Sequence, residues 1–109
     1  MSIRLPVAIA LYVKAEDSGD LSLLAECFAP DGMVRDEGRT YRGRPAIRGW
    51  KAETKTKYNH TVTPLEVARR ETATVMKARL DGDFPGSPVT LEFRFTLEGG
   101  KIASLEIGA

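Results

Sequence analysis

The sequence predicts an α+β fold in which a cone-shaped, curved antiparallel sheet carries three helices on one face and encloses a pocket. Helical patterns fill the N-terminal half of the chain and strand patterns the C-terminal half, an order typical of helices packed on an antiparallel sheet. The 109 residues contain neither repeats nor a linker-like stretch, so we expect a single domain over residues 1–109. In such a cone, the side of the sheet that faces the helices often leaves a cavity open at one end.

The first helix is predicted over about Pro6–Ser18. Its apolar residues recur at helical spacing and form one buried stripe of Leu5, Ala8, Ile9, Tyr12 and Ala15. Gly19 is a typical stop after a helix, and Asp20 is a typical cap for a second helix. We expect this second helix to end at Pro30. Its inner side would hold Leu21, Leu24, Ala25 and Phe28.

A short strand is predicted over residues 32–36, with a turn at residues 37–39. A third helix then begins at residues 43–45, where a proline suits the first helical turn. Its inner face would carry Ile47, Trp50 and Thr54.

From Tyr58 onward the pattern changes towards a period of two, with Tyr58, His60 and Val62 on one face of a strand. Further strands are predicted over about Thr72–Leu80, Pro88–Glu98 and Lys101–Ile107. Turn residues at 81–86 and 99–100 separate these strands. The strand at 88–98 alternates most clearly, and one of its faces holds Val89, Leu91, Phe93, Phe95 and Leu97.

Composition excludes several classes of partner. Sixteen basic and fifteen acidic residues give a net charge of +1, so we expect no nucleic acid, because phosphate binding needs a basic excess. No apolar run reaches the length of a membrane span, so we expect no membrane partner. The N-terminal segment lacks the features of a secretion signal, which favours a cytoplasmic protein. The single cysteine, Cys27, cannot form an internal disulfide and is predicted to be a packed thiol.

Short motifs spread over the chain resemble those of the nuclear transport factor 2-like superfamily. They are YVKA at 12–15, SGD at 18–20, CFAPD at 27–31, VRD at 34–36, YRGRPAI at 41–47, FRF at 93–95 and GGKI at 99–102. Each motif is short, and their order and spacing carry the resemblance. Within the superfamily the pattern is most similar to the steroid Δ-isomerases and the SnoaL-like polyketide cyclases. The superfamily hosts isomerases, cyclases, dehydratases, epoxide hydrolases and non-catalytic binding proteins, so the fold alone gives no activity.

The resemblance implies roles for three positions. Tyr12 matches the tyrosine that donates to the substrate carbonyl in the isomerases, and Asp36 matches their general-base aspartate. Their third group is a protonated aspartate two residues before the FRF-type motif. That position holds Leu91 here, which removes half of the pair that stabilises an oxyanion.

The chemistry of Asp36 and Tyr12 fits these roles. A carboxylate in an apolar pocket has a raised pKa and can take a proton from carbon beside a carbonyl. A buried tyrosine hydroxyl needs a partner, which a ligand oxygen or Asp36 would supply. The alternatives are a solvated loop aspartate in the run Arg35-Asp36-Glu37 and an ordinary core tyrosine.

Six further residues, named at the end of this paragraph, are candidates for binding a ligand. The aromatic residues among them have a spacing that is also typical of an ordinary core. His60, the only histidine, either lines the pocket or is structural, and it has no partner in the spacing of a metal site. The predicted ligand-binding residues are Trp50, Tyr58, His60, Phe28, Leu91 and Phe93.

Two main hypotheses for function follow. The first is a cofactor-free isomerase, cyclase or dehydratase of a small apolar carbonyl compound, and the second is a binding module that leaves its ligand unchanged. Arg79, Asp81 and Glu106 offer a weaker parallel with epoxide hydrolases of this fold. A homodimer through the outer sheet face is also expected. The last strand is partly apolar on both faces, so its outer side would need a partner to cover it. If assembly is the main role, the polar outer face would be the working surface.

Overall fold

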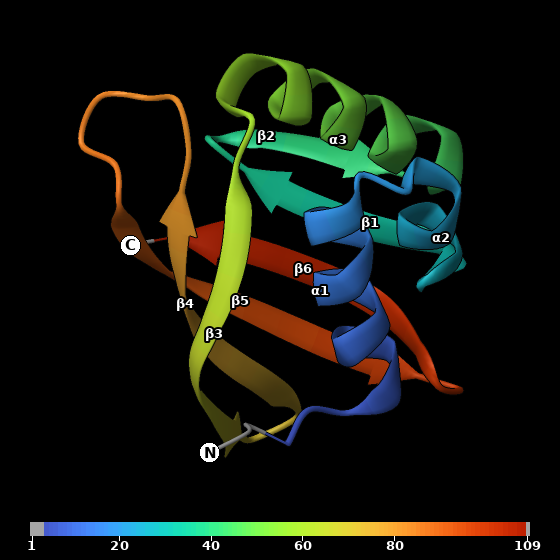
Figure 1. Cartoon of the computed structure of the whole chain (residues 1–109). Coiled ribbons are helices and arrows are strands. Elements are labelled where there is room, and N and C mark those ends of the chain that lie inside the picture. The colour runs from blue at the N-terminus through green and yellow to red at the C-terminus, as the bar shows by residue number, and fades with distance from the viewer. Residues whose placement is uncertain (1–3, 109) are drawn as a thin grey trace.

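The computed structural model of the chain describes residues 4–108. Residues 1–3, which belong to the N-terminal segment considered above for a secretion signal, lie outside the described part. That part contains three helices and six strands, which Figure 1 labels. In chain order they are α1 (Val7–Ser18), α2 (Leu21–Glu26), β1 (Phe28–Asp36), β2 (Arg39–Arg42), α3 (Arg44–Tyr58), β3 (Thr61–Arg70), β4 (Ala73–Asp81), β5 (Val89–Glu98) and β6 (Lys101–Gly108).

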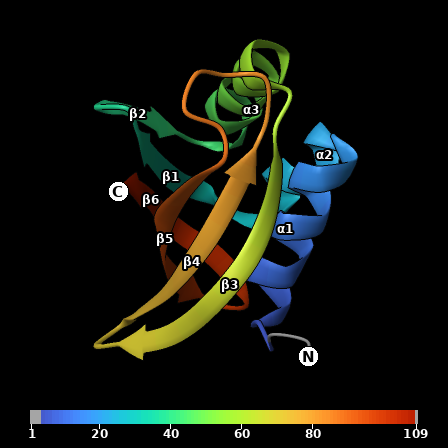
Figure 2. The same ribbon diagram turned by 60° about the vertical axis from the view of Figure 1, so that its left-hand side comes forward.

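The six strands form one sheet in the order β2-β1-β6-β5-β4-β3. Neighbouring strands run antiparallel except β1 and β6, which run parallel. Figures 1 and 2 show that the sheet curves around the helices and stays unclosed, with β2 and β3 as its edges. The predicted α+β architecture is confirmed, and the parallel β1–β6 pair is its one departure from an antiparallel sheet.

The first helix is built as its apolar stripe predicts. Ala8, Ile9, Tyr12 and Ala15 are buried. Gly19 ends the helix with φ 73°, the left-handed conformation that glycine adopts without steric penalty. Asp20 then caps α2 by accepting a hydrogen bond of 3.0 Å from the backbone N–H of Leu23.

The predicted extent of the second helix is wrong. The helix ends at Glu26, and Phe28 starts β1 rather than continuing the helix. The backbone joins the sheet here because the N–H of Ile102 donates to the Cys27 carbonyl at 2.8 Å. The Arg44 guanidinium also donates to the Phe28 carbonyl, at 2.8 and 3.0 Å. Cys27 is buried, as predicted for a packed thiol.

The predicted strand at Tyr58 is also wrong. The third helix continues to Tyr58, Asn59 caps it at φ 45°, and β3 begins only at Thr61. The N–H of Asn59 donates to the Lys55 carbonyl, and the Lys55 ammonium donates to the His60 carbonyl. These bonds terminate the helix where the sequence pattern resembles a strand. The short strand β2 was not predicted.

The core lies between the helices and the inner face of the sheet. Phe93 and Phe95 of β5 are buried while Arg94 between them is exposed, so the predicted alternation is confirmed at the centre of this strand. Val89 and Leu97 at its ends are exposed. Tyr12 packs edge-on against both rings, with centroid distances of 6.4 and 5.5 Å. This aromatic contact packs α1 against the inner face of β5.

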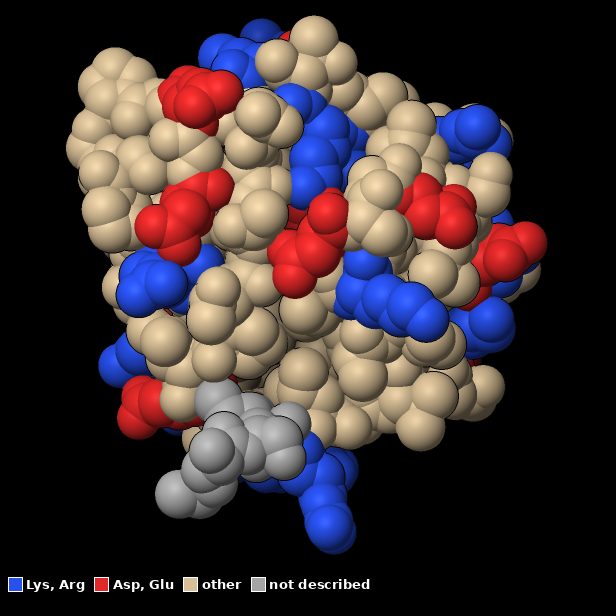
Figure 3. Space-filling model, in the orientation of Figure 1, with Lys and Arg blue, Asp and Glu red and all other residues tan. Residues whose placement is uncertain are grey.

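The described helices are too short or too polar to span a membrane. On the face shown in Figure 3, acidic and basic side chains are interspersed rather than gathered by sign. That distribution agrees with the balanced charge of the sequence.

Candidate functional site

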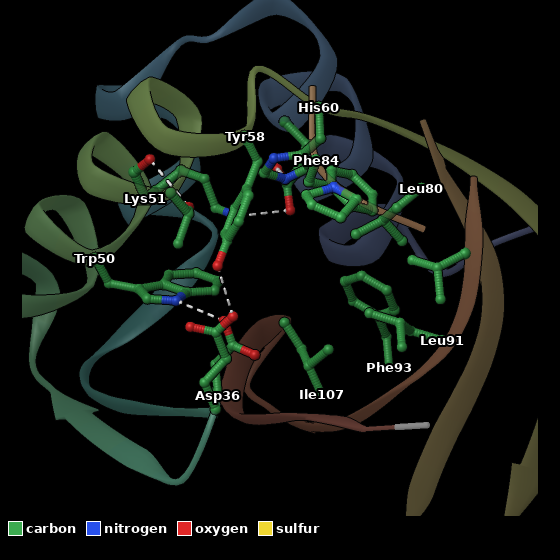
Figure 4. Close-up of a pocket in the computed structure, with 15 residues that line it drawn as sticks. Asp36, Trp50, Lys51, Tyr58, His60, Leu80, Phe84, Leu91, Phe93 and Ile107 are labelled. Carbon is green, nitrogen blue, oxygen red and sulfur yellow. Dashed lines mark hydrogen bonds and ion pairs between the residues drawn. The ribbon is translucent and has the colours of Figure 1, made fainter. Parts of the chain in front are cut away.

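A pocket of about 430 Å³ opens at the end of the fold where α3, the end of β1, the β4–β5 loop and β5 meet (Figure 4). This volume lies in the lower part of the range of small-molecule sites, roughly 300–1,000 Å³. Its apolar lining consists of Leu80, Phe84, Pro85, Val89, Leu91, Phe93 and Ile107. Its other lining residues are Glu16, Asp36, Glu37, Trp50, Lys51, Thr54, Tyr58 and His60.

A tight turn positions Asp36 at the pocket. Asp36 is the last residue of β1 and pairs with Arg39 of β2 across a two-residue hairpin. Glu37 and Gly38 between them both have positive φ, at 52° and 76°, as a type I′ turn requires. The Glu37 conformation is unfavourable for a residue with a Cβ, and the Tyr58 hydroxyl holds it by donating to Glu37 Oε1 at 2.9 Å.

The surroundings of Asp36 favour its neutral form. The carboxyl is half-buried, and Trp50 Nε1 donates to its Oδ2 at 3.0 Å. Burial raises the pKa of Asp36 above its ordinary value of 3.8, and the neighbouring Glu37 charge adds to this effect. The Trp50 hydrogen bond and the Lys51 charge act in the opposite direction but do not cancel the rise. Asp36 is therefore a stronger base than a solvated aspartate.

Replacing Trp50→Phe is expected to raise the pKa of Asp36 further, because the substitution removes the hydrogen bond that stabilises the charged form. Carbon-13 NMR of the carboxyl group during a pH titration measures this directly. Tyr41→Phe is the control, since the Tyr41 ring lies 6.1 Å from that of Trp50 and the substitution retains that ring. An unchanged Asp36 pKa in Trp50→Phe would contradict the hydrogen bond.

A second polar cluster lies on the α1 side of the pocket and is centred on Glu16. The Tyr12 hydroxyl and the Lys51 ammonium donate to Glu16 Oε2 at 2.6 and 2.8 Å, and His60 Nε2 lies 3.1 Å from Glu16 Oε1. Glu16, Lys51 and His60 are only 1%, 2% and 5% exposed. We call Glu16, Tyr12, Lys51 and His60 the Glu16 cluster.

Charges in the Glu16 cluster stabilise one another. Burial alone would raise the pKa of Glu16, but the Lys51 charge and the hydrogen bonds from His60, Lys51 and Tyr12 lower it from 4.5 to about 2. Burial raises the pKa of Tyr12 well above 10, so its hydroxyl stays a donor. Burial lowers the pKa of Lys51, while the Glu16 carboxylate favours its charged form. The pocket thus holds two carboxyl groups whose pKa values move in opposite directions, a pattern typical of sites that separate proton-transfer roles.

A sequence profile of the SnoaL-like domain matches residues 9–105, which is most of the chain. The chain belongs to the SnoaL-like domain family. Among curated proteins, none matches its sequence.

Solved structures similar to this SnoaL-like domain share its fold. A proposed polyketide cyclase from Sinorhizobium meliloti is 40% identical, with 94% of each chain covered and a TM-score of 0.91. A protein of ketosteroid isomerase-like fold from Catenulispora acidiphila, solved with trimethylamine, is 26% identical, with 97% of this chain and 87% of that chain covered and a TM-score of 0.85.

The epoxide hydrolase/cyclase-like enzyme SalBIII, which has a role in pyran ring formation in salinomycin, is 18% identical. The match covers 94% of this chain and 87% of SalBIII, with a TM-score of 0.79, and at that identity it shows the fold alone. The family profile and the solved structures agree on the SnoaL-like fold.

The SnoaL-like pocket brings together most of the residues singled out from the sequence. Asp36 and five of the six predicted ligand-binding residues line it, namely Trp50, Tyr58, His60, Leu91 and Phe93. Tyr12 and Phe28 do not. Both are fully buried in the core behind the pocket wall, and their rings pack against each other at 6.1 Å.

The three residues of the epoxide hydrolase parallel, Arg79, Asp81 and Glu106, do not line the SnoaL-like pocket. Arg79 donates to Asp81 at 3.0 Å on the exposed side of the sheet, and neither residue lines the pocket. Glu106 is exposed and pairs in register with Arg94 on the same outer side. The parallel with epoxide hydrolases therefore has no counterpart in the pocket.

Sequence reasoning missed Glu16 and Lys51, although a signal was present. Glu16 follows Tyr12 by four residues and Lys51 follows Ile47 by four, so both lie on the buried faces of their helices. A charged residue on a buried helical face is almost always paired or functional. Among the residues that the structure describes, no group of three or more His, Cys, Asp or Glu side chains is arranged to hold a metal ion.

Proposed function

We propose that this SnoaL-like domain is a cofactor-free isomerase, cyclase or dehydratase that acts on a small carbonyl compound, with Asp36 as the general base. One observation carries the proposal: a half-buried carboxyl group of raised pKa faces a pocket with seven apolar side chains in its lining. Asp36 would take a proton from the carbon next to the carbonyl group, and this proton transfer would begin each of the three reactions.

The enolate that forms would need a positive or donating group near its oxygen. Lys51 is the one lysine or arginine among the residues that line this pocket, and we propose it for this role. The Tyr12 hydroxyl already donates to Glu16 at 2.6 Å, and Tyr12 itself is buried in the core and does not line the pocket. Tyr12 would therefore support the Glu16 cluster rather than touch the carbonyl, which revises the role suggested by the steroid isomerases.

A test of Asp36 does not require the natural substrate. The small aromatic probe 5-nitrobenzisoxazole gives up a carbon-bound proton to a base. Its N–O bond then breaks, a nitrile forms, and the released phenolate is coloured. We expect the wild-type protein to accelerate this ring opening well beyond an equal concentration of acetate, because the pocket desolvates the carboxylate.

Two variants make the test specific to Asp36. Asp36→Asn is expected to lose the acceleration, and Asp31→Asn, on the exposed part of the same strand, is expected to retain it. Equal rates for the wild type and Asp36→Asn would overturn the proposal. A competing ligand that fills the pocket should slow the wild type and leave the rate with acetate unchanged.

A non-catalytic binding module is the second candidate. It is favoured by Leu91, which lines the pocket where the steroid isomerases have an acid, so the pocket has one donor fewer. A binding module would hold pocket ligands with the same affinity in the wild type and Asp36→Asn, and it would not accelerate ring opening of the probe.

We also propose the homodimer through the outer face of the sheet, which holds Thr90, Glu92, Arg94 and Thr96. Arg94 and Thr90 are exposed in the single chain, so the face is polar and would suit a hydrated interface. Gel filtration at micromolar concentration measures the assembly directly, and a monomer mass would contradict it.

A further inference from the structure

We propose that Nδ1 of His60 is a ligand-binding atom that accepts a hydrogen bond from a hydroxyl or N–H group of the ligand, and that Glu16 holds the ring in the state that makes this possible. The inference rests on the proposed function in placing a carbonyl compound in the same pocket. It adds that this compound also carries a hydrogen-bond donor. It requires no catalysis, so binding alone can test it.

Glu16 determines which histidine nitrogen carries the hydrogen. An ionised carboxylate can only accept hydrogen bonds, and Glu16 accepts from Tyr12 and Lys51 on one oxygen. The contact of 3.1 Å between His60 Nε2 and the other oxygen is therefore a hydrogen bond that Nε2 donates. In the neutral imidazole, the opposite nitrogen, Nδ1, then has a free lone pair.

That lone pair lacks a partner within the protein. Among the described residues, His60 Nδ1 is the one buried side-chain nitrogen or oxygen atom without a hydrogen bond. A buried polar atom left unpaired destabilises the fold, and such atoms in native proteins usually reflect a function. His60 lines the pocket while Nδ1 itself is enclosed, so a bound molecule would supply the donor by displacing a side chain that covers Nδ1.

Contacts around His60 hold its backbone in place, and Glu16 holds its ring through Nε2. The Lys55 ammonium donates to the His60 carbonyl, and Asp17 accepts from the N–H of Val62 at 2.9 Å. Gly82 packs so closely that a Cβ there would lie 2.9 Å from His60 Cβ and 2.6 Å from the Tyr58 carbonyl oxygen. The His60 backbone is fixed from behind, so the side chains on the pocket side are the ones that would move to admit a ligand.

The position of His60 defines the shape of the ligand. Figure 4 shows His60 and Asp36 at opposite ends of the group of lining side chains, with Phe93 and Leu91 along one side. A ligand that spans the pocket would place its reacting carbon at Asp36, an apolar body against Phe93 and Leu91, and its hydroxyl or N–H group at His60. We infer a hydroxylated or amino-substituted carbonyl compound with a flat apolar centre.

The test compares two probes of nearly equal size, 2-naphthol and its methyl ether, 2-methoxynaphthalene. Only the naphthol has a donor, so we expect the wild type to bind it roughly three- to tenfold more tightly in a calorimetric titration. His60→Phe keeps a ring but removes the acceptor and should abolish the preference. Asp36→Asn should retain the preference, which separates this site from the proposed base.

Because the chain has a single histidine, nitrogen-15 labelling of histidine gives a second readout without any substitution. We expect Nε2 to carry the hydrogen in the free protein, and the Nδ1 resonance to move when 2-naphthol is added but not when the ether is added. These two results would support the proposal even if His60→Phe did not fold.

Several outcomes would overturn the inference. They are a proton on Nδ1 in the free protein, equal affinity for the two probes, binding of neither probe, and a preference that survives His60→Phe but disappears in Asp36→Asn. The last result would assign the ligand hydroxyl to Asp36. Unchanged ring-opening activity in Asp36→Asn would overturn the proposed base and leave the His60 inference unaffected, so the two proposals fail separately.

Discussion

Replacing Glu16→Gln is expected to lower the free energy of unfolding by about 3–5 kcal/mol, the usual consequence of removing one partner of a buried ion pair. Glu16 is 1% exposed and accepts hydrogen bonds from Tyr12, Lys51 and His60. An amide can accept some of these bonds but cannot neutralise the Lys51 ammonium, which is 2% exposed. The charge would then remain desolvated without a counterion.

Chemical denaturation of the wild type and variants measures this loss. The matched control is Glu66→Gln, which removes an exposed ion pair with Lys77 at 3.5 Å and should change the unfolding free energy by less than about 1 kcal/mol. Adding Lys51→Met to Glu16→Gln removes the buried ammonium that has lost its counterion and should recover part of the stability. Equal small effects of Glu16→Gln and Glu66→Gln would show that the Glu16 cluster does not hold a buried charge pair.

The pH dependence of stability gives an independent test of Glu16. Its pKa is lowered from 4.5 to about 2 in the folded protein, so the folded state holds the Glu16 proton less tightly than the unfolded state. The resulting stabilisation is complete above about pH 4.5 and is lost as the pH falls through 4.5 towards 2. Unfolding curves of the wild type should show this loss, and the part due to Glu16 should be missing in Glu16→Gln.

The sequence predicts the fold well because its strongest patterns are local. The stripe of Ile9, Tyr12 and Ala15 and the alternation of Phe93, Arg94 and Phe95 each define which face is buried, and the structure confirms both. Errors arise where tertiary hydrogen bonds decide the outcome. Phe28 has the spacing of a helix, yet its neighbour Cys27 pairs with Ile102, which lies far away in the sequence.

The candidate site is harder to derive from the sequence, since its groups come from distant segments. Asp36 follows a recognisable strand and turn, so a role at the pocket could be inferred. Tyr12 and Glu16 differ by one helical turn, and no local pattern shows which of them faces the pocket and which lies behind it. The three-dimensional structure places Lys51 and His60 on Glu16, and only that contact explains how so many polar groups are buried together.

Asp36→Asn is expected to lower kcat/KM for proton abstraction by roughly 10²–10⁴, the range that general-base catalysis contributes. The amide cannot accept the proton, while its oxygen can still accept the Trp50 hydrogen bond, so the pocket should keep its shape. Ring opening of 5-nitrobenzisoxazole measures the loss, with Asp31→Asn as the control on the exposed part of β1. A loss below about twofold would rule out Asp36 as the base.

The pH profile then separates a base from a merely structural aspartate. The active form is the carboxylate, so the rate of the wild type should rise with pH and level off above the pKa of Asp36, with its midpoint above 3.8. Stability should move the other way. A carboxyl group with a raised pKa binds its proton more tightly in the folded state, so the wild type should lose stability relative to Asp36→Asn as the pH rises from about 3.8 through the folded pKa. A variant that is inactive yet at least as stable at neutral pH is expected only if the fold keeps Asp36 desolvated for its chemistry.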